Sequence, residues 1–127
     1  MKNILIADDH FLVRDTIAAY LDAVGDFKVF TAHDLGTALE VMDGLESIDL
    51  LILDYNMPGM NGLQGLERAC KSYPACKVAL MSGVANRDVA NNAMKQNARG
   101  FIPKSLSANS FINAIRFILA GETYFPF

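Results

Sequence analysis

Five polar residues with chemically useful side chains stand at the ends of short apolar runs. They are Asp8 and Asp9 after residues 4–7, Asp54 after residues 50–53, Ser82 after residues 78–81, and Lys104 shortly after the pair 101–102. Carboxylates bind hard divalent cations, whereas a hydroxyl and an ammonium group bind the oxygens of an anion. If these residues meet, they can therefore hold a cation and an anion together.

Three converging carboxylates repel one another and call for a cation. Two unit charges ~4 Å apart at an effective dielectric of ~20 interact by about 4 kcal/mol. Oxygen ligands favour Mg²⁺, with Mn²⁺ as a substitute, and three aspartates, one lysine and a divalent ion sum formally to zero. We therefore expect a site prepared for an incoming phosphoryl group, whose oxygens the metal and Lys104 would share. Ser82 and backbone amides of residues 57–59 are further candidate donors.

Asp54 is the best candidate for the nucleophile. It stands alone at the end of a central apolar run and precedes a tight turn at residues 57–59. Asp8 and Asp9 are adjacent, so their side chains diverge and suit a metal cradle better than a nucleophilic role. In isolation each residue also has an ordinary explanation: Asp8 and Asp9 as a solvated helix start, Asp54 as a turn residue, Ser82 as a helix cap and Lys104 as a surface amine.

The segments that must position these residues alternate between two patterns. Uninterrupted apolar runs of the kind found in strands buried on both faces occur at 4–7, 50–53 and 78–81, with weaker candidates at 29–30 and 101–102. Between and after them, apolar residues recur at helical spacing. The five series begin at Val13, Leu35, Leu63, Val89 and Phe111. Gly25 and Gly121 are predicted helix ends, and Asn61 with Gln64 predicts a helix start of the capping-box type.

Five strand–helix repeats predict an α/β fold with a parallel sheet between layers of helices. In such a sheet, the residues that follow the carboxyl ends of the strands collect at one edge. This rule predicts that the five polar residues meet, although they lie far apart in the chain.

Length and composition favour one globular domain over residues 1–127. The chain has 52% hydrophobic residues and a formal charge of −3, with its Lys and Arg scattered. We expect no direct nucleic-acid binding by this segment, no membrane span and a cytoplasmic location. Cys70 and Cys76 lack the pattern of a zinc site and are interpreted as reduced thiols. His10 and His33 are interpreted as surface or helix-end residues without a metal role.

The chain resembles receiver domains of the bacterial two-component response regulators over essentially its whole length. Four motifs carry the resemblance, at residues 7–10 (ADDH), 53–62 (LDYNMPGMNG), 81–83 (MSG) and 100–105 (GFIPKS). Their joint order and spacing are specific, whereas an Asp-Asp pair alone is not. The resemblance implies a flavodoxin-like, doubly wound sandwich of five parallel strands in the order 2-1-3-4-5 with five helices.

The resemblance also implies the site roles. Asp54 would accept a phosphoryl group from a phosphohistidine of a sensor histidine kinase or phosphotransfer protein. Mg²⁺ would bind Asp9 directly, Asp8 through water, Asp54 by a carboxylate oxygen and Asn56 by its backbone carbonyl. Ser82 and Lys104 would hold the phosphoryl oxygens, so Asp54, Ser82 and Lys104 are the predicted catalytic set.

Phe101 matches the aromatic switch position of the family. Our hypothesis is that Ser82 moves toward the phosphoryl group and that Phe101 fills the vacated space. The surface that changes would serve a partner or a homodimer. Asn56 and Val84 are neither acids nor bases, so we expect slow loss of the phosphoryl group from a signalling domain that is not an enzyme.

The chain departs from the family at two positions. Ser105 follows Lys104 where the family commonly has a proline after a cis bond, and a cis bond to a non-proline costs about 3 kcal/mol. Asn61 replaces a common aspartate and would keep a helix cap.

The end of the chain is similar to receivers that carry a C-terminal helix-turn-helix DNA-binding domain. Residues 120–127 would then begin a linker to an output domain that controls transcription. The alternative of a receiver that acts alone stays open.

Two other classes share the architecture. Aspartyl-nucleophile phosphatases use a second aspartate two positions after the nucleophile, where this chain has Asn56, and they usually carry a cap domain. Flavin-binding electron carriers have a Ser/Thr/Gly-rich phosphate loop after the first strand, which this sequence lacks.

Overall fold

Five strands and five helices alternate along the chain in the computed structural model, which describes residues 1–44, 47–84 and 86–126. The strands are β1 (Lys2–Ala7), β2 (Phe27–Ala32), β3 (Leu50–Asp54), β4 (Lys77–Ser82) and β5 (Gly100–Pro103). The helices are α1 (Phe11–Val24), α2 (Leu35–Gly44), α3 (Gln64–Ser72), α4 (Arg87–Lys95) and α5 (Ala108–Leu119). The alternation predicted from the apolar pattern is confirmed.

The strands form one parallel sheet in the order β2-β1-β3-β4-β5, as the resemblance implied. The register aligns the carboxyl ends of neighbouring strands. Ala7 pairs with Leu53, Asp54 with Met81, and Ser82 with Pro103. Residues that follow these strands therefore begin at the same edge of the sheet.

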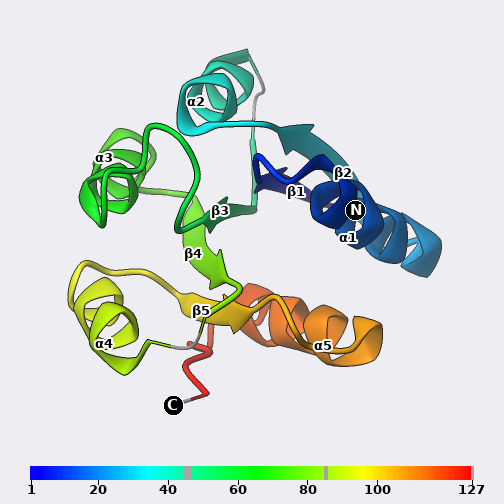
Figure 1. Ribbon diagram of the computed structural model, residues 1–127. Coiled ribbons are helices and arrows are strands. Elements are labelled where there is room, and N and C mark those ends of the chain that lie inside the picture. Colours follow the sequence, from blue (N-terminus) through cyan, green and yellow to red (C-terminus); the bar gives the residue numbers. More distant parts are fainter. Residues whose placement is uncertain (45–46, 85, 127) are drawn as a thin grey trace.

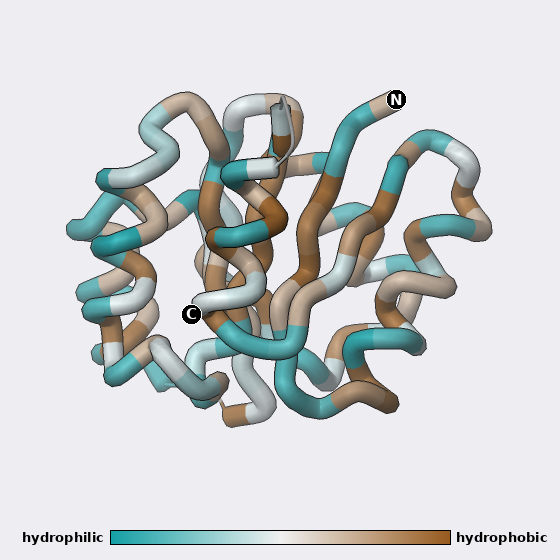
Figure 2. The backbone as a smooth tube through the Cα atoms, turned by 90° about the horizontal axis from the view of Figure 1, so that it is seen from above, coloured by the Kyte–Doolittle hydropathy of each residue, from teal (hydrophilic) through white to brown (hydrophobic). Residues whose placement is uncertain are grey.

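Helices cover both faces of the sheet, with α2, α3 and α4 on one side and α1 and α5 on the other (Figure 1). Successive strand residues point to opposite faces, so Leu51 and Leu53 join the core under α2–α4 while Leu50 and Ile52 join the core under α1 and α5. The central strands are correspondingly hydrophobic, and hydrophilic segments lie mainly on the outer helices (Figure 2). Both faces of the sheet are thus buried, which explains the uninterrupted apolar runs.

Helix boundaries agree with the predictions at the two glycines but not at Asn61. Gly25 ends α1 in the left-handed conformation with φ 85°, and Gly121 follows α5 with φ 100°. Asn61 has φ 51°, and its side chain bonds the Gln64 side chain rather than a backbone N–H. The predicted capping box is therefore wrong, because a capping residue needs an extended backbone and α3 begins only after the turn.

The segment after α5 returns to the outer edge of β5. The Phe101 N–H donates to the Tyr124 carbonyl at 2.9 Å, and the Tyr124 N–H donates to the Arg99 carbonyl at 2.9 Å. Tyr124 pairs with Gly100 in a parallel bridge. The expected linker at 120–127, described as far as residue 126, thus begins with a segment that covers the sheet edge.

Candidate functional site

Asp8, Asp54 and Lys104 meet at the carboxyl edge of the sheet. The Lys104 Nζ lies 2.9 Å from Asp8 Oδ2 and 3.1 Å from Asp54 Oδ2. Asp8 follows β1, Asp54 ends β3 and Lys104 follows β5, so three separate strands supply the group. The predicted convergence of these residues is confirmed.

Burial strongly shapes the electrostatics of the two carboxylates, whose side chains are 0% (Asp8) and 1% (Asp54) exposed. Burial and the neighbouring Asp8 raise the pKa of Asp54 above its usual value, and Lys104 offsets this only in part. Burial also acts to raise the pKa of Asp8, but the hydrogen bond from the His10 N–H and the contact with Lys104 outweigh it and leave the pKa lowered. The pair therefore carries excess negative charge that an additional cation would stabilise.

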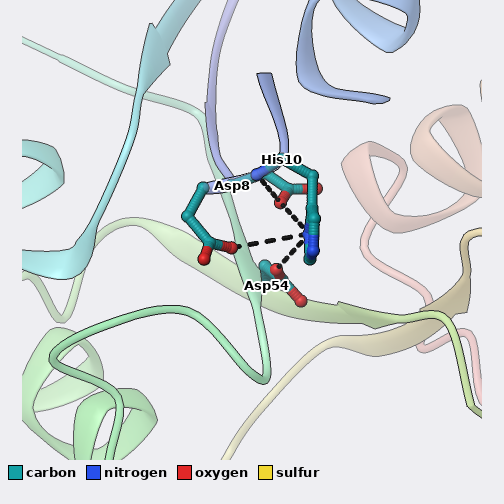
Figure 3. Close-up of side chains that lie close together, drawn as sticks. Asp8, His10 and Asp54 are labelled. Carbon is teal, nitrogen blue, oxygen red and sulfur yellow. Dashed lines mark hydrogen bonds and ion pairs between the residues drawn. The ribbon is translucent and has the colours of Figure 1, made fainter. Parts of the chain in front are cut away.

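His10 lies inside this cluster, which the sequence interpretation did not foresee (Figure 3). Its Nδ1 is 3.2 Å from Asp8 Oδ1, 3.5 Å from Asp9 Oδ1 and 3.7 Å from Asp54 Oδ2. His10 is the N-cap residue of α1, so the expected helix-end position is correct while its surroundings were missed. Its place directly after the Asp-Asp pair was the available signal.

A small open pocket of about 240 Å³ adjoins Asp54. It is lined by His10, Val13, Asp54, Asn56, Gly83, Val84 and Lys104. Such a pocket suits a small anion. The Lys104 ammonium group would neutralise its charge, and the Asp54 carboxylate could form a bond to it. Asn56 and Val84, the two non-ionisable neighbours expected beside the nucleophile, both line it.

Ser82 is buried and engages its own loop. Its hydroxyl donates to the Val84 carbonyl at 3.1 Å and accepts from the Val84 N–H at 3.2 Å. The Ser82 carbonyl also accepts from the Lys104 N–H at 2.9 Å. Ser82 thus links the β4 end to Lys104 through the backbone, while its hydroxyl is held by Val84.

The turn after Asp54 brings Asn56 back to the carboxylate. The Asn56 N–H donates to Asp54 Oδ1 at 3.3 Å, whereas the Met57 N–H donates to the Asp54 backbone carbonyl and Pro58 has no N–H. The amide bonded to this carboxylate is that of Asn56, and donation to a phosphoryl group by amides of residues 57–59 stays a prediction. Gly59 has φ 92°, and a Cβ there would lie 3.0 Å from the Leu35 Cβ, so the turn requires glycine.

Phe101 and the Lys104–Ser105 bond complete the predicted site. Phe101 is 1% exposed and belongs to the core under α2–α4, as expected for an inward-packed aromatic residue. No peptide bond between described residues is cis, so Lys104–Ser105 is trans. The cis bond common in the family is absent where serine replaces proline.

The carboxylate set fits a divalent cation. Ligand atoms of Asp8, Asp9, His10 and Asp54 all lie within 4.8 Å of one another. Asp8 and Asp54 are buried and Asp9 is partly exposed. An ion could therefore be bound by the two buried carboxylates and still be accessible to solvent on the side of Asp9. An acidic cluster of this kind is present, as the sequence predicted.

Two other expectations concern residues away from the site. Cys70 and Cys76 are free thiols, both half-buried. Within the described ranges, no helix has the length and apolar character needed to cross a bilayer.

Sequence comparison finds a family match over most of the chain. The model of the response regulator receiver domain matches residues 4–116. The chain is 38% identical over 127 residues to the glycerol metabolism activator of Pseudomonas putida, which covers 99% of this chain and 58% of that protein. It is 26% identical over 124 residues to the response regulator UvrY of Escherichia coli, covering 98% of this chain and 57% of UvrY. The chain thus spans less than two thirds of these relatives.

Solved structures of similar sequence share the fold. The signal receiver domain of the putative response regulator NarL from Mycobacterium tuberculosis has 30% identity and a TM-score of 0.85, covering 95% of this chain and 98% of that one. A LuxR family DNA-binding response regulator from Silicibacter pomeroyi also has 30% identity and a TM-score of 0.85, with 99% of this chain and 97% of that one covered.

Proposed function

This chain belongs to the response regulator receiver domain family, and from that premise we propose that Asp54 is its phosphoacceptor. The family acts in phosphorylation-dependent signalling, and its domains are not classical enzymes. The observation that carries the assignment is the buried Asp54 carboxylate, 3.1 Å from Lys104 and open to a small pocket. An oxygen nucleophile beside a fixed cation suits attack on phosphorus.

The reaction moves one phosphoryl group without a net redox change. An Asp54 carboxylate oxygen forms the new O–P bond while the P–N bond of a phosphohistidine donor breaks, and the histidine regains its electron pair. Lys104 neutralises charge on the transferred oxygens. Asp54 takes this role rather than Asp8 because Asp54 lines the pocket and Asp8 does not.

Mg²⁺ is the proposed cofactor, with Mn²⁺ as a substitute. Asp8, Asp9, Asp54 and the Asn56 carbonyl would hold it, and when bound it would supply positive charge that stabilises the phosphoryl oxygens. The acidic cluster supports this proposal. The buried pair Asp8 and Asp54 faces the single Lys104 ammonium, so a divalent ion would relieve their repulsion.

Ser82 and Phe101 are the proposed switch. Phosphorylation adds about −1.5 to −2 charges, and the Ser82 hydroxyl would exchange its Val84 contacts for a phosphoryl oxygen. Phe101 would then repack and alter the surface of α4, β5 and α5. Phe101→Ala is expected to uncouple this surface from phosphorylation, and an unchanged output at full Asp54 phosphorylation would contradict the role of the aromatic ring.

The phosphoryl group should be lost slowly. Asn56 and Val84 flank the pocket and neither can act as a general acid or base toward water, so slow loss also requires that His10, which lines the same pocket, does not activate a water. Removing the phosphodonor and following intact mass with time checks this expectation. Complete loss of the phosphoryl group within the time needed to remove the donor would contradict it.

The whole protein is proposed to control transcription. The name of one relative, the DNA-binding response regulator of Silicibacter pomeroyi, supports a DNA-binding output domain outside this chain, and a cytoplasmic location stays a prediction. Its partners would be a sensor histidine kinase or phosphotransfer protein and, after phosphorylation, a second copy.

The test is incubation with Mg²⁺ and a small phosphodonor, followed by intact mass measurement. Wild type should gain one phosphoryl group, while Asp54→Asn and wild type in EDTA should gain none. Equal phosphorylation of Asp54→Asn would overturn the assignment. Steady turnover of a generic phosphomonoester would instead favour a phosphatase.

A further inference from the structure

His10 is the one nitrogen ligand among the described residues that lies within the acidic cluster. It follows the Asp-Asp pair and caps α1, and its side chain turns back over Asp54 (Figure 3). Three carboxylates surround its Nδ1, and the Lys104 Nζ lies 3.5 Å from the same nitrogen, so an ion bound there would have to share this space with the ammonium group. The imidazole as a whole is 63% exposed, so one side of the cluster faces solvent.

The distances around this nitrogen match the edges of a four-coordinate site. A tetrahedral ion with bonds of about 2.0–2.1 Å places its ligand atoms about 3.4 Å apart. His10 Nδ1 lies 3.2, 3.5 and 3.7 Å from oxygens of Asp8, Asp9 and Asp54. All four ligand atoms lie within 4.8 Å of one another, so the carboxylates would draw closer together around a bound ion.

The buried oxygens give an independent reason for a cation. Asp8 Oδ2 and Asp54 Oδ2 are buried and share one ammonium group, the Lys104 Nζ at 2.9 and 3.1 Å, with no other hydrogen-bond donor within the described part of the chain. Three carboxylates and one ammonium group leave a formal charge of −2. A divalent ion would cancel it.

We propose that His10 makes this cluster a site for late first-row divalent ions, exemplified by Zn²⁺ and Co²⁺, which compete there with Mg²⁺. Imidazole favours Zn²⁺, Co²⁺ and Ni²⁺, whereas Mg²⁺ takes oxygen ligands. His10 therefore adds affinity for the first group and little for the second. An ion held by Asp54 and His10 would compete with the Mg²⁺ that phosphorylation requires and would therefore inhibit phosphorylation. This consequence rests on the proposed function.

The test measures metal binding directly, without phosphorylation. The background is a Cys70→Ser, Cys76→Ser protein, because free thiols also bind these ions. Zn²⁺ affinity is measured by competition with a chromogenic chelator, and Co²⁺ by its visible spectrum. His10→Ala should weaken the affinity for Zn²⁺ and Co²⁺ by about tenfold or more, because even the loss of a group that only supports a metal ligand costs about that much. The affinity for Mg²⁺ should change much less.

His33→Ala is the matched control, because His33 also lies beside an aspartate, with Nε2 3.6 Å from Asp34 Oδ2, but outside the cluster. It should bind Zn²⁺ like the background protein. If His10→Ala fails to fold, as judged by circular dichroism, His10→Asn and the imidazole ¹⁵N shift of His10 on adding Zn²⁺ provide the same test. Equal Zn²⁺ affinity with and without the imidazole, or no ¹⁵N shift, would overturn the inference.

The two proposals can fail separately. Zn²⁺ binding that depends on His10 in a protein that never gains a phosphoryl group would refute only the phosphoacceptor assignment. If Asp54 is phosphorylated but the Zn²⁺ affinity is the same with and without His10, only the metal inference is refuted.

Discussion

At the residue scale, Asp8 and Asp54 hold two buried carboxylates against one lysine. This arrangement lowers stability in the metal-free protein and prepares a place for cation and phosphoryl group. Burial acts to raise the pKa of both carboxyls, but the hydrogen bond from the His10 N–H and the Lys104 contact reverse the shift at Asp8, while the neighbouring Asp8 adds to it at Asp54.

Asp54→Asn should therefore raise the free energy of unfolding of the metal-free protein at neutral pH by about 1 kcal/mol. Folding raises the pKa of Asp54, so the charge penalty present at neutral pH is lost as the pH falls through this raised pKa and is gone below the usual value of 3.8. Urea unfolding in EDTA at several pH values measures this gain, which should shrink on acidification.

Asp9→Asn is the control, because Asp9 is partly exposed. It should change stability much less than Asp54→Asn. A destabilised Asp54→Asn protein, or a gain independent of pH, would contradict the electrostatic account.

Cys76 provides a second prediction at this scale. Burial raises the pKa of its thiol to about 11 from a usual value of 9.0. Because the thiolate is the reactive form, alkylation of Cys76 near pH 8 should be about a hundredfold slower in the folded protein than in urea. Mass spectrometry of iodoacetamide-treated protein measures this ratio, and equally fast labelling in both states would refute it.

His10 and Asn61 show what residue patterns leave undetermined. The polar residues at strand ends could be predicted because parallel strands place their carboxyl ends together. The direction of the His10 side chain depends on its rotamer at the start of α1, which neighbouring residue types do not specify. Asn61 was misassigned because its positive φ belongs to a turn that also contains Gly59 and Gly62.

At the element scale, β5 connects the site to the end of the chain. Phe101 is buried and precedes Lys104 by three residues. Its N–H donates to the Tyr124 carbonyl. The returning tail covers the outer edge of β5, which would otherwise expose unpaired backbone groups. This long-range pairing carries no local sequence pattern, so it could not be predicted.

Gly100→Ala should loosen the tail. A Cβ at this position would lie 2.8 Å from Ile118 Cδ1 and 3.1 Å from the Tyr124 carbonyl oxygen. We expect destabilisation by about 1–3 kcal/mol and faster hydrogen exchange at the Phe101 and Tyr124 amides. Gly44→Ala is the matched control, because a Cβ there meets nothing within 4 Å. Unchanged exchange in Gly100→Ala would show that the tail is not held by close packing.

At the scale of the whole molecule, the parallel sheet is what makes the site. Three strands deliver Asp8, Asp54 and Lys104 to one edge, and two apolar cores fix the register of those strands. The parallel sheet and the acidic cluster at its edge were predictable from strand–helix alternation, whereas the strand order came from the resemblance to receiver domains. The side-chain contacts inside the cluster could not be predicted from the sequence, because they depend on the positions of atoms to within about an ångström.

The central claim is that this edge directs a phosphoryl group to one carboxylate. Reduction of the phosphorylated protein with borohydride, followed by peptide mass spectrometry, locates acyl phosphate by its reduced aspartyl product. The account predicts modification at Asp54 alone, in the presence of Mg²⁺ and a phosphodonor. Modification at Asp8 or Asp9 instead, or at no aspartate in protein shown to be folded and supplied with Mg²⁺, would contradict it.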